Sequence, residues 1–390
     1  MTMKQDAGDP GAERLDALME MEPSAVMAAF RAGRINRRDV FKLLGALGLT
    51  AAGASLLRAD ALAADDLKLI IWEGYADDKY RKPFESSNKV TVAPTNASTG
   101  DEMFGLMNDS GGKNFDLVSA SSDLPRRLYD KGLLAEIDTS KLTNYDKLFD
   151  QFKKPSYITF DGKLYGVNFA WGPTIMIYDT EAITTAPMSW TAMLDEKYKG
   201  KIATWNYPLQ IAQFALMLTP APADPFELND EQLAQVKAMI KRQRPLIRKY
   251  WDYGQETWEL FQNKEIVIAD GWPYVTINAL AKGAKVAEVS PVEGVTGWSD
   301  SWCISKHAAN YDLALKWADW MIGEEAQIGV TEVMNYSITN KDAIAKLSAE
   351  RKKALRMTDV PTDYAKIHMW RFIPASEDKW VPPWHAAPRG

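Results

Sequence analysis

The chain has 390 residues, 46% of them hydrophobic and 25% charged, which is typical of globular proteins and leads us to expect two domains. The net charge of −6 argues against a nucleic-acid partner, because phosphates require a basic surface. A single cysteine excludes an internal disulfide, and the three histidines lack the spacing of zinc ligands. We therefore expect no metal and no cofactor.

Residues 1–63 are predicted to form an N-terminal extension that ends in an export leader. Arg37 and Arg38 precede an apolar run at 40–57, and ALA at 61–63 is a small-x-small cleavage site. Paired arginines beside such a run resemble a twin-arginine leader, although the preceding residue departs from the usual pattern. We expect the twin-arginine machinery to export the chain to the periplasm, with cleavage near Ala63. A retained membrane anchor is the alternative, since about 18 residues can just span a bilayer.

Beyond the leader, strands and helices alternate along the chain. Strands are predicted at 67–72, 90–92, 115–118, 201–204 and 265–269, and helices at 101–108, 123–129, 191–196, 230–241, 256–262 and 312–322. This alternation is typical of α/β sheets, which bind ligands at the carboxyl ends of their strands.

The sequence GWSDSW at 297–302 places an acid between two tryptophans. In a strand, Trp298, Asp300 and Trp302 would share one face, because side chains alternate with a period of two. A carboxylate on a half-buried aromatic face requires a positive partner. That partner is either a structural Arg or Lys or a positively charged ligand.

Several stretches in the same order resemble the periplasmic solute-binding proteins of ABC importers, in particular the spermidine/putrescine-binding branch. They are IWEGY at 71–75, FDLV at 115–118, GLL at 132–134, ID at 137–138, WG at 171–172, SW at 189–190, YKG at 198–200 and WSDS at 298–301. The resemblance covers nearly all of residues 64–345. It implies an α/β two-lobed periplasmic-binding-protein fold, in which each lobe is a mixed β-sheet flanked by helices and crossing hinge strands join the lobes.

The resemblance also implies where the lobes lie and what they do. Lobe 1 would hold residues 64–170 plus 300–347, and lobe 2 residues 171–299 plus 348–390. The protein would be a monomeric, non-catalytic binding subunit that captures a small organic amine, such as putrescine or spermidine, and delivers it to ABC permease and ATPase subunits. A zwitterionic solute such as a γ-amino acid is the alternative ligand. An exported enzyme on the same fold is the alternative class.

Ten residues are candidates for ligand contact because they match, or replace, the family's pocket positions. They are Trp72, Tyr75, Ser121, Asp123, Tyr207, Gln210, Trp272, Trp298, Asp300 and Arg371. Trp298 and Asp300 match the residues that hold the amine, and a carboxylate and an indole suit an ammonium through a charge-assisted hydrogen bond and cation–π attraction. Purely structural roles remain open, with Asp300 paired to a lysine, Trp72 in the core and Ser121 capping a helix.

Four of these positions depart from the polyamine binders. Tyr207 and Gln210 stand where those proteins carry two acids, so we expect long polyamines to bind no better than a compact amine or zwitterion. Asp123 replaces a pocket tyrosine. Arg371 stands near a ligand-binding glutamine and would bind a carboxylate if it reaches the cleft. Packing between the lobes is the alternative role for Arg371.

The export interpretation is testable by replacing Arg37 and Arg38 together with lysine. Because the paired arginines are what distinguish this leader, the double variant should accumulate as unprocessed precursor in the cytoplasm. Cell fractionation and immunoblotting would show the precursor and the mature form. Normal delivery of the double variant would contradict the twin-arginine interpretation.

Overall fold

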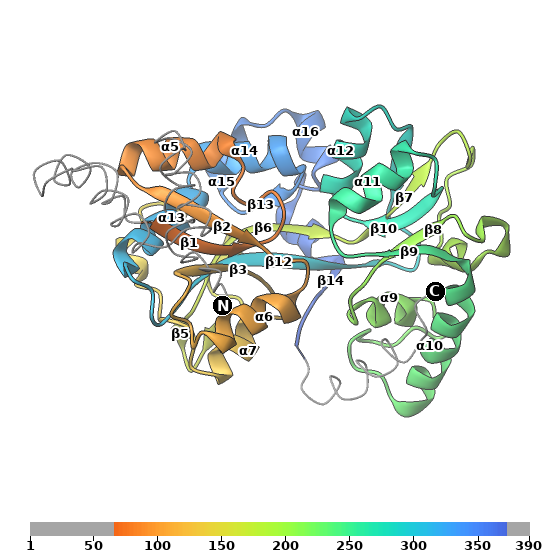
Figure 1. Ribbon diagram of the computed structural model, residues 1–390, viewed down its shortest axis with the longest axis horizontal. Coiled ribbons are helices and arrows are strands. Elements are labelled where there is room, and N and C mark those ends of the chain that lie inside the picture. Colours follow the sequence, from red (N-terminus) through yellow and green to blue (C-terminus); the bar gives the residue numbers. More distant parts are fainter. Residues whose placement is uncertain (1–65, 373–390) are drawn as a thin grey trace, which may run out of the picture. The chain divides into compact units, whose positions relative to one another are not determined.

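The computed structural model describes residues 66–372, so the predicted leader lies outside them (Figure 1). The predicted α/β fold is confirmed, with two mixed sheets that each have their own helices. The larger sheet runs in the order β13-β6-β12-β3-β1-β2, with β14 paired to β12. Its strands are β1 (Asp66–Ile71), β2 (Thr91–Asn96), β3 (Leu117–Ser121), β6 (Val167–Pro173), β12 (Val295–Ile304), β13 (Ser337–Ile338) and β14 (Ile367–Met369). We call this sheet and its helices lobe 1.

The smaller sheet forms the core of lobe 2 and runs in the order β11-β7-β10-β8-β9. Its strands are β7 (Ile175–Asp179), β8 (Ile202–Trp205), β9 (Ile247–Trp251), β10 (Ile268–Gly271) and β11 (Val286–Val289). A separate two-stranded hairpin pairs β4 (Thr159–Phe160) with β5 (Lys163–Leu164). Both sheets contain parallel and antiparallel pairs of strands. In the larger sheet, for example, β3 pairs with β1 in parallel and with β12 antiparallel.

Helices flank both sheets. Those of lobe 1 include α5 (Asp78–Asn88), α6 (Gly100–Asp109), α7 (Pro125–Asp130), α8 (Asp150–Lys153), α13 (Tyr311–Met321), α14 (Glu324–Met334) and α15 (Lys341–Lys346). Those of lobe 2 include α9 (Gln210–Leu216), α10 (Asp230–Gln243), α11 (Gly254–Gln262) and α12 (Pro273–Ala281). Near the carboxyl end lie α16 (Ala349–Ala354) and α17 (Val360–Ala365). Helix α13 packs on β12 and β6, and α12 packs on β11.

One predicted helix needs correction, and several elements were not predicted at all. The helix predicted at 191–196 is instead two 3₁₀ helices, Trp190–Leu194 and Glu196–Tyr198, because the side chains of Ser189 and Asp195 each cap a new short turn. No element was predicted for residues 78–88, which form α5. Asp77 caps its first turn, and Tyr80 and Phe84 form its buried stripe.

Strands β6 and β12 join the two lobes. They pair along most of their length, β6 continues into β7 of lobe 2, and β12 follows β11 of lobe 2 (Figure 1). The Thr174 amide donates to the Thr296 carbonyl at 2.7 Å where the chains leave the larger sheet. Because β12 is continuous across the predicted lobe boundary at 299/300, the exact boundaries remain a proposal.

The crossing point is tight and requires a glycine. A Cβ on Gly297 would overlap the carbonyl oxygen of Gly172 and lie 3.0 Å from the Cα of Pro173. Backbone atoms cannot move aside as a flexible side chain can, so the β12–β6 pairing depends on the missing side chain.

We expect Gly297→Ala to lower the free energy of unfolding by about 1–3 kcal/mol, through this overlap. Gly105→Ala in α6 is the matched control, because a Cβ there has no neighbour within 4 Å and alanine favours a helix. Urea unfolding followed by circular dichroism would give both values. Equal midpoints for the two variants would contradict the tight crossing.

Candidate functional site

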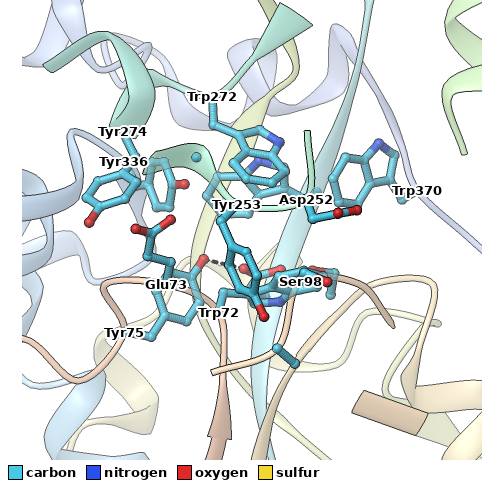
Figure 2. A pocket seen from close by; sticks show the side chains of 15 residues that line it. Trp72, Glu73, Tyr75, Ser98, Asp252, Tyr253, Trp272, Tyr274, Tyr336 and Trp370 are labelled. Atoms are coloured by element: carbon cyan, nitrogen blue, oxygen red, sulfur yellow. Dashed lines mark hydrogen bonds between the residues drawn. The ribbon is translucent and has the colours of Figure 1, made fainter. Parts of the chain in front are cut away.

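A pocket of about 440 Å³, including its opening to solvent, lies where loops of both lobes meet the crossing strands (Figure 2). Its walls come from the chain that follows β1, β2, β9, β10 and β14, from the end of β3, from β12 and from the residue before β13. The lining residues are Trp72, Glu73, Tyr75, Ala97, Ser98, Ser121, Asp252, Tyr253, Gly254, Trp272, Tyr274, Trp298, Asp300, Tyr336 and Trp370. Most follow the carboxyl ends of strands, as expected for an α/β sheet.

The lining combines aromatic rings with acids. Eight of its side chains are aromatic, three are carboxylates (Glu73, Asp252 and Asp300), and none of these lining residues is Lys, Arg or His. Aromatic faces attract cations, and a carboxylate in such surroundings has few other ways to be neutralised. The pocket is therefore suited to a positively charged organic group.

Asp300 lies on β12 in the middle of the larger sheet, where β3 and β6 flank it. It is only 2% exposed, and the Tyr75 hydroxyl donates to its Oδ2, whereas its Oδ1 has no hydrogen-bond partner. Burial raises the pKa of Asp300 to about 7, although the neighbouring hydroxyls of Ser121 and Tyr75 favour the charged form and partly oppose this rise. One oxygen of this carboxylate is thus fixed and the other is left free for a donor.

The two tryptophans on either side of Asp300 in β12 lie in different surroundings. Trp298 lines the pocket, with its ring centroid 4.3 Å from that of Tyr336. Trp302 instead packs in the core of lobe 1, where its ring lies edge-on to Trp317 of α13 at 5.5 Å. The predicted sharing of one face is consistent with this arrangement, but Trp302 does not line the pocket.

On the lobe 2 side, a layer of tryptophans supports the pocket. The ring of Trp205 stacks on Trp370 at 5.1 Å and meets Trp272 edge-on at 5.2 Å. Asp270 is fully buried and anchors this layer, because it accepts hydrogen bonds from the Trp205 amide at 2.9 Å and from Trp251 Nε1 at 3.2 Å. Asp270 therefore holds the rings in place and does not line the pocket.

Glu73 approaches lobe 2 from the loop after β1. Its Oε2 lies beside Gly254 at the start of α11 and has no hydrogen-bond partner. Burial raises the pKa of Glu73, while the nearby backbone amides of Gln255 and Gly254 favour the charged form and partly oppose this rise. Figure 2 shows this carboxylate beside Tyr274 and Tyr336.

The structure brings six of the ten candidate residues to this pocket. They are Trp72, Tyr75, Ser121, Trp272, Trp298 and Asp300. The other four do not line it. The Tyr207 hydroxyl donates to Asp123 at 3.1 Å across the lobes, and Gln210 donates to Asp270.

Arg371 also lies outside the pocket. Its guanidinium pairs with Asp224 and with Glu227, the latter at 3.0 Å, in the loop before α10. Two acids thus already accept hydrogen bonds from this side chain in lobe 2.

Sequence reasoning did not single out several lining residues, among them Glu73, Asp252, Tyr253, Tyr274, Tyr336 and Trp370. A local signal existed for some of them. The sequence WEGY at 72–75 directly follows β1, and the sequence WDYG at 251–254 begins with the last residue of β9, so both place an aromatic residue, an acid and a glycine at the end of a strand. The second was missed because β9 was not predicted.

Residues 79–358 match the family described as bacterial extracellular solute-binding protein. The spermidine/putrescine-binding periplasmic protein of Escherichia coli is 24% identical over 77% of this chain and 86% of its own length. The putrescine/cadaverine-binding protein of Pseudomonas aeruginosa is 22% identical over 79% of this chain and 89% of its own length.

The fold has counterparts among solved structures. The spermidine/putrescine ABC transporter substrate-binding protein of Streptococcus pneumoniae superposes with a TM-score of 0.67, at 20% identity, over 82% of this chain and 97% of that one. This likeness confirms the two-lobed periplasmic-binding-protein fold. Within residues 66–372, no helix is both long enough and apolar enough to span a bilayer.

The family match covers more than half of the chain, and it confirms the resemblance on which the sequence interpretation relied. The matched family consists of solute-binding proteins and not of enzymes. The chain therefore belongs to the bacterial extracellular solute-binding proteins, the family that supplies ABC importers with their substrate-binding subunits.

Proposed function

We propose that this protein captures a small organic amine between its two lobes in the periplasm and delivers it to the permease and ATPase subunits of an ABC importer. The observation that carries the proposal is the free Oδ1 of Asp300, a buried carboxylate oxygen inside an aromatic pocket. An ammonium group would satisfy that oxygen with a charge-assisted hydrogen bond, and Trp298 would add a cation–π contact. Two relatives named for binding putrescine support the same chemistry.

The proposal includes a monomer that binds its solute without changing it. An exported enzyme on the same fold would convert the solute, so mass spectrometry of the ligand recovered after incubation separates the two classes. Export by the twin-arginine machinery belongs to the proposal as well and rests on the paired arginines of the leader.

A compact zwitterion such as a γ-amino acid is the second candidate ligand. The indole Nε1 atoms of Trp72, Trp272 and Trp298 are buried and lack hydrogen-bond partners. Unpartnered donors around a pocket suit a ligand that also carries an acceptor, such as a carboxylate. The amine remains the first candidate because the lining holds three acids and no base.

We expect Asp300→Asn to weaken putrescine binding by roughly ten- to a hundredfold, because a hydrogen bond to a charged group contributes about 1.5–3 kcal/mol. Asp312→Asn is the control, since it removes the same charge from an exposed acid of α13 outside the pocket. Isothermal titration calorimetry would measure both. If Asp300→Asn binds putrescine, spermidine and γ-aminobutyrate as tightly as the wild type, Asp300 is a structural acid.

Binding should also depend on pH, with a sign fixed by the raised pKa of Asp300. An ammonium pairs with the carboxylate form, so below a pKa of about 7 the protein must first release a proton. Affinity for putrescine should then fall roughly tenfold between pH 8 and pH 6, as the ionised fraction falls from about nine-tenths to one-tenth.

Neighbouring groups also titrate in this range, so the variant is the necessary comparison. Burial raises the pKa of Asp123 to about 6, and burial raises that of Glu73. Titrations of wild type and Asp300→Asn at matched pH values isolate the contribution of Asp300. An equally steep pH dependence in both proteins would show that another group controls binding.

A further inference from the structure

Strand β6 contains a bulge directly beside the Asp300 carboxylate. Ala170 pairs with Asp300 and Asn168 pairs with Ser301, so the register shifts and Phe169 between them has no counterpart on β12. Two successive residues of β6, Phe169 and Ala170, therefore oppose the single residue Asp300. Bulges of this kind change the direction of the side chains around them and are common beside functional sites.

The bulge residue places its ring against the tyrosine that holds Asp300. The Phe169 ring is fully buried and meets the Tyr75 ring edge-on, with 5.0 Å between the centroids and 83° between the planes. The same ring packs against Trp302 at 5.2 Å. The Tyr75 hydroxyl donates to Asp300 Oδ2. Phe169 thus limits where Tyr75 can lie, and Tyr75 in turn fixes one oxygen of the carboxylate.

Side chains from outside β6 bind the backbone of the bulge. Strand β13 pairs with β6 only as far as Ala170. Beyond it, Gln327 Nε2 of α14 donates to the Phe169 carbonyl at 2.8 Å, and Thr339 Oγ1 donates to the Asn168 carbonyl at 3.1 Å. Gln327 is fully buried, and its Oε1 accepts a hydrogen bond from the Thr339 amide at 2.9 Å. The bulge is therefore held in place by specific hydrogen bonds, as buried backbone groups require.

Side chains also fasten β6 to β12 at the bulge. Asn168 Nδ2 donates to Ser299 Oγ at 2.8 Å and to Ser301 Oγ at 3.2 Å. These two serines precede and follow Asp300, so they lie on the face of β12 opposite to its carboxylate. Asn168 and both serines are fully buried. The two strands are thus joined behind Asp300 as well as beside it.

We propose that Phe169 is a positioning residue of the amine site. Its ring keeps the Tyr75 hydroxyl on Asp300. Gln327 and Asn168 act one step further away, by holding the bulge. This inference rests on the proposed amine-binding function, and it requires no contact between Phe169 and the ligand, since Phe169 does not line the pocket. A donor fixed in advance by packing keeps one oxygen of Asp300 occupied and leaves the other directed at the ammonium.

The test variant is Phe169→Leu, which removes the aromatic contact with Tyr75 and keeps the backbone hydrogen bonds of the bulge. We expect it to weaken putrescine binding roughly three- to tenfold, because the hydrogen bond from Tyr75 to Asp300 is no longer held in place. Tyr75→Phe removes that hydrogen bond directly. If Phe169 acts through it, adding Phe169→Leu to Tyr75→Phe should cause no further loss of affinity. Calorimetry on the two single variants and the double variant would measure this coupling.

The pH profile distinguishes positioning from a general loss of stability. The Tyr75 hydroxyl favours the charged form of Asp300, so its displacement should raise the pKa of Asp300 above about 7. The affinity lost in Phe169→Leu should therefore be larger at pH 7 than at pH 9, where Asp300 is ionised in both proteins. The other ionisable groups that act on Asp300 or are affected by its charge, namely Asp123, Tyr157 and Tyr336, are the same in both proteins.

A second variant tests the next step of the relay. Gln327→Met keeps the length of the side chain and removes the hydrogen bond to the Phe169 carbonyl. It should weaken putrescine binding in the same way and show the same coupling to Tyr75→Phe. Thermal unfolding would confirm that each variant is folded.

The matched control is Asp116→Asn. Asp116 is also buried in lobe 1, and it accepts hydrogen bonds from the backbone amides of Lys68 at 2.8 Å and Ala309 at 2.7 Å. It lies before β3, whereas Ser121 at the other end of that strand lines the pocket. Asp116→Asn should lower the unfolding temperature and leave putrescine affinity and its pH profile unchanged.

Two outcomes would overturn the assignment. If Phe169→Leu binds putrescine as tightly as the wild type, the ring is only part of the core. If its loss adds in full to that of Tyr75→Phe and does not vary with pH, Phe169 does not act through Tyr75. Asp300→Asn separates these failures from failure of the proposed function, because unchanged binding of every ligand by that variant would remove the amine site itself.

Discussion

The structure depends on a carboxylate buried in the centre of a sheet. Asp300 is 2% exposed on the strand that joins the lobes, and it is flanked by β3 and β6. Burying an ionised group is costly unless charge and hydrogen bonds compensate it. The Tyr75 hydroxyl satisfies one oxygen and the other stays free, so the cost is only partly offset. A cationic ligand would complete the compensation, which links binding directly to the stability of the joined strands.

Around this strand, contacts between the two lobes enclose the pocket. The Tyr207 hydroxyl of lobe 2 donates to Asp123 of lobe 1, and Glu73 of lobe 1 lies beside Gly254 at the start of α11 in lobe 2. Both contacts join residues far apart in the sequence, and a single hydrogen bond such as that of Tyr207 contributes modestly. Such weak contacts can form and break as lobes close and open, and a ligand held by both lobes would add to them.

The sequence predicted the residues of the site that local periodicity controls, and missed those that long-range pairing controls. Period-two alternation placed Trp298 and Asp300 together, and a single strand end brought Trp72 and Tyr75 to the same pocket. The partner of Tyr207 could not be predicted, because Asp123 is 84 residues away and on the other lobe. Tyr336 was missed for a related reason. It precedes a strand of only two residues, which has no periodicity to detect.

The three acids that line the pocket lie on different parts of the fold, so movement of the two lobes would affect them differently. Asp300 lies on β12, which pairs inside the larger sheet and leads directly to lobe 2, so the joining strand itself carries the first ligand contact. Glu73 and Asp252 lie on loops of opposite lobes, after β1 and β9. Their separation is therefore set by how the lobes meet, whereas the place of Asp300 is set by the sheet. In the amine complex that we propose, the contact at Asp300 is thus fixed by the sheet, whereas any contact at Glu73 or Asp252 depends on how the two lobes meet.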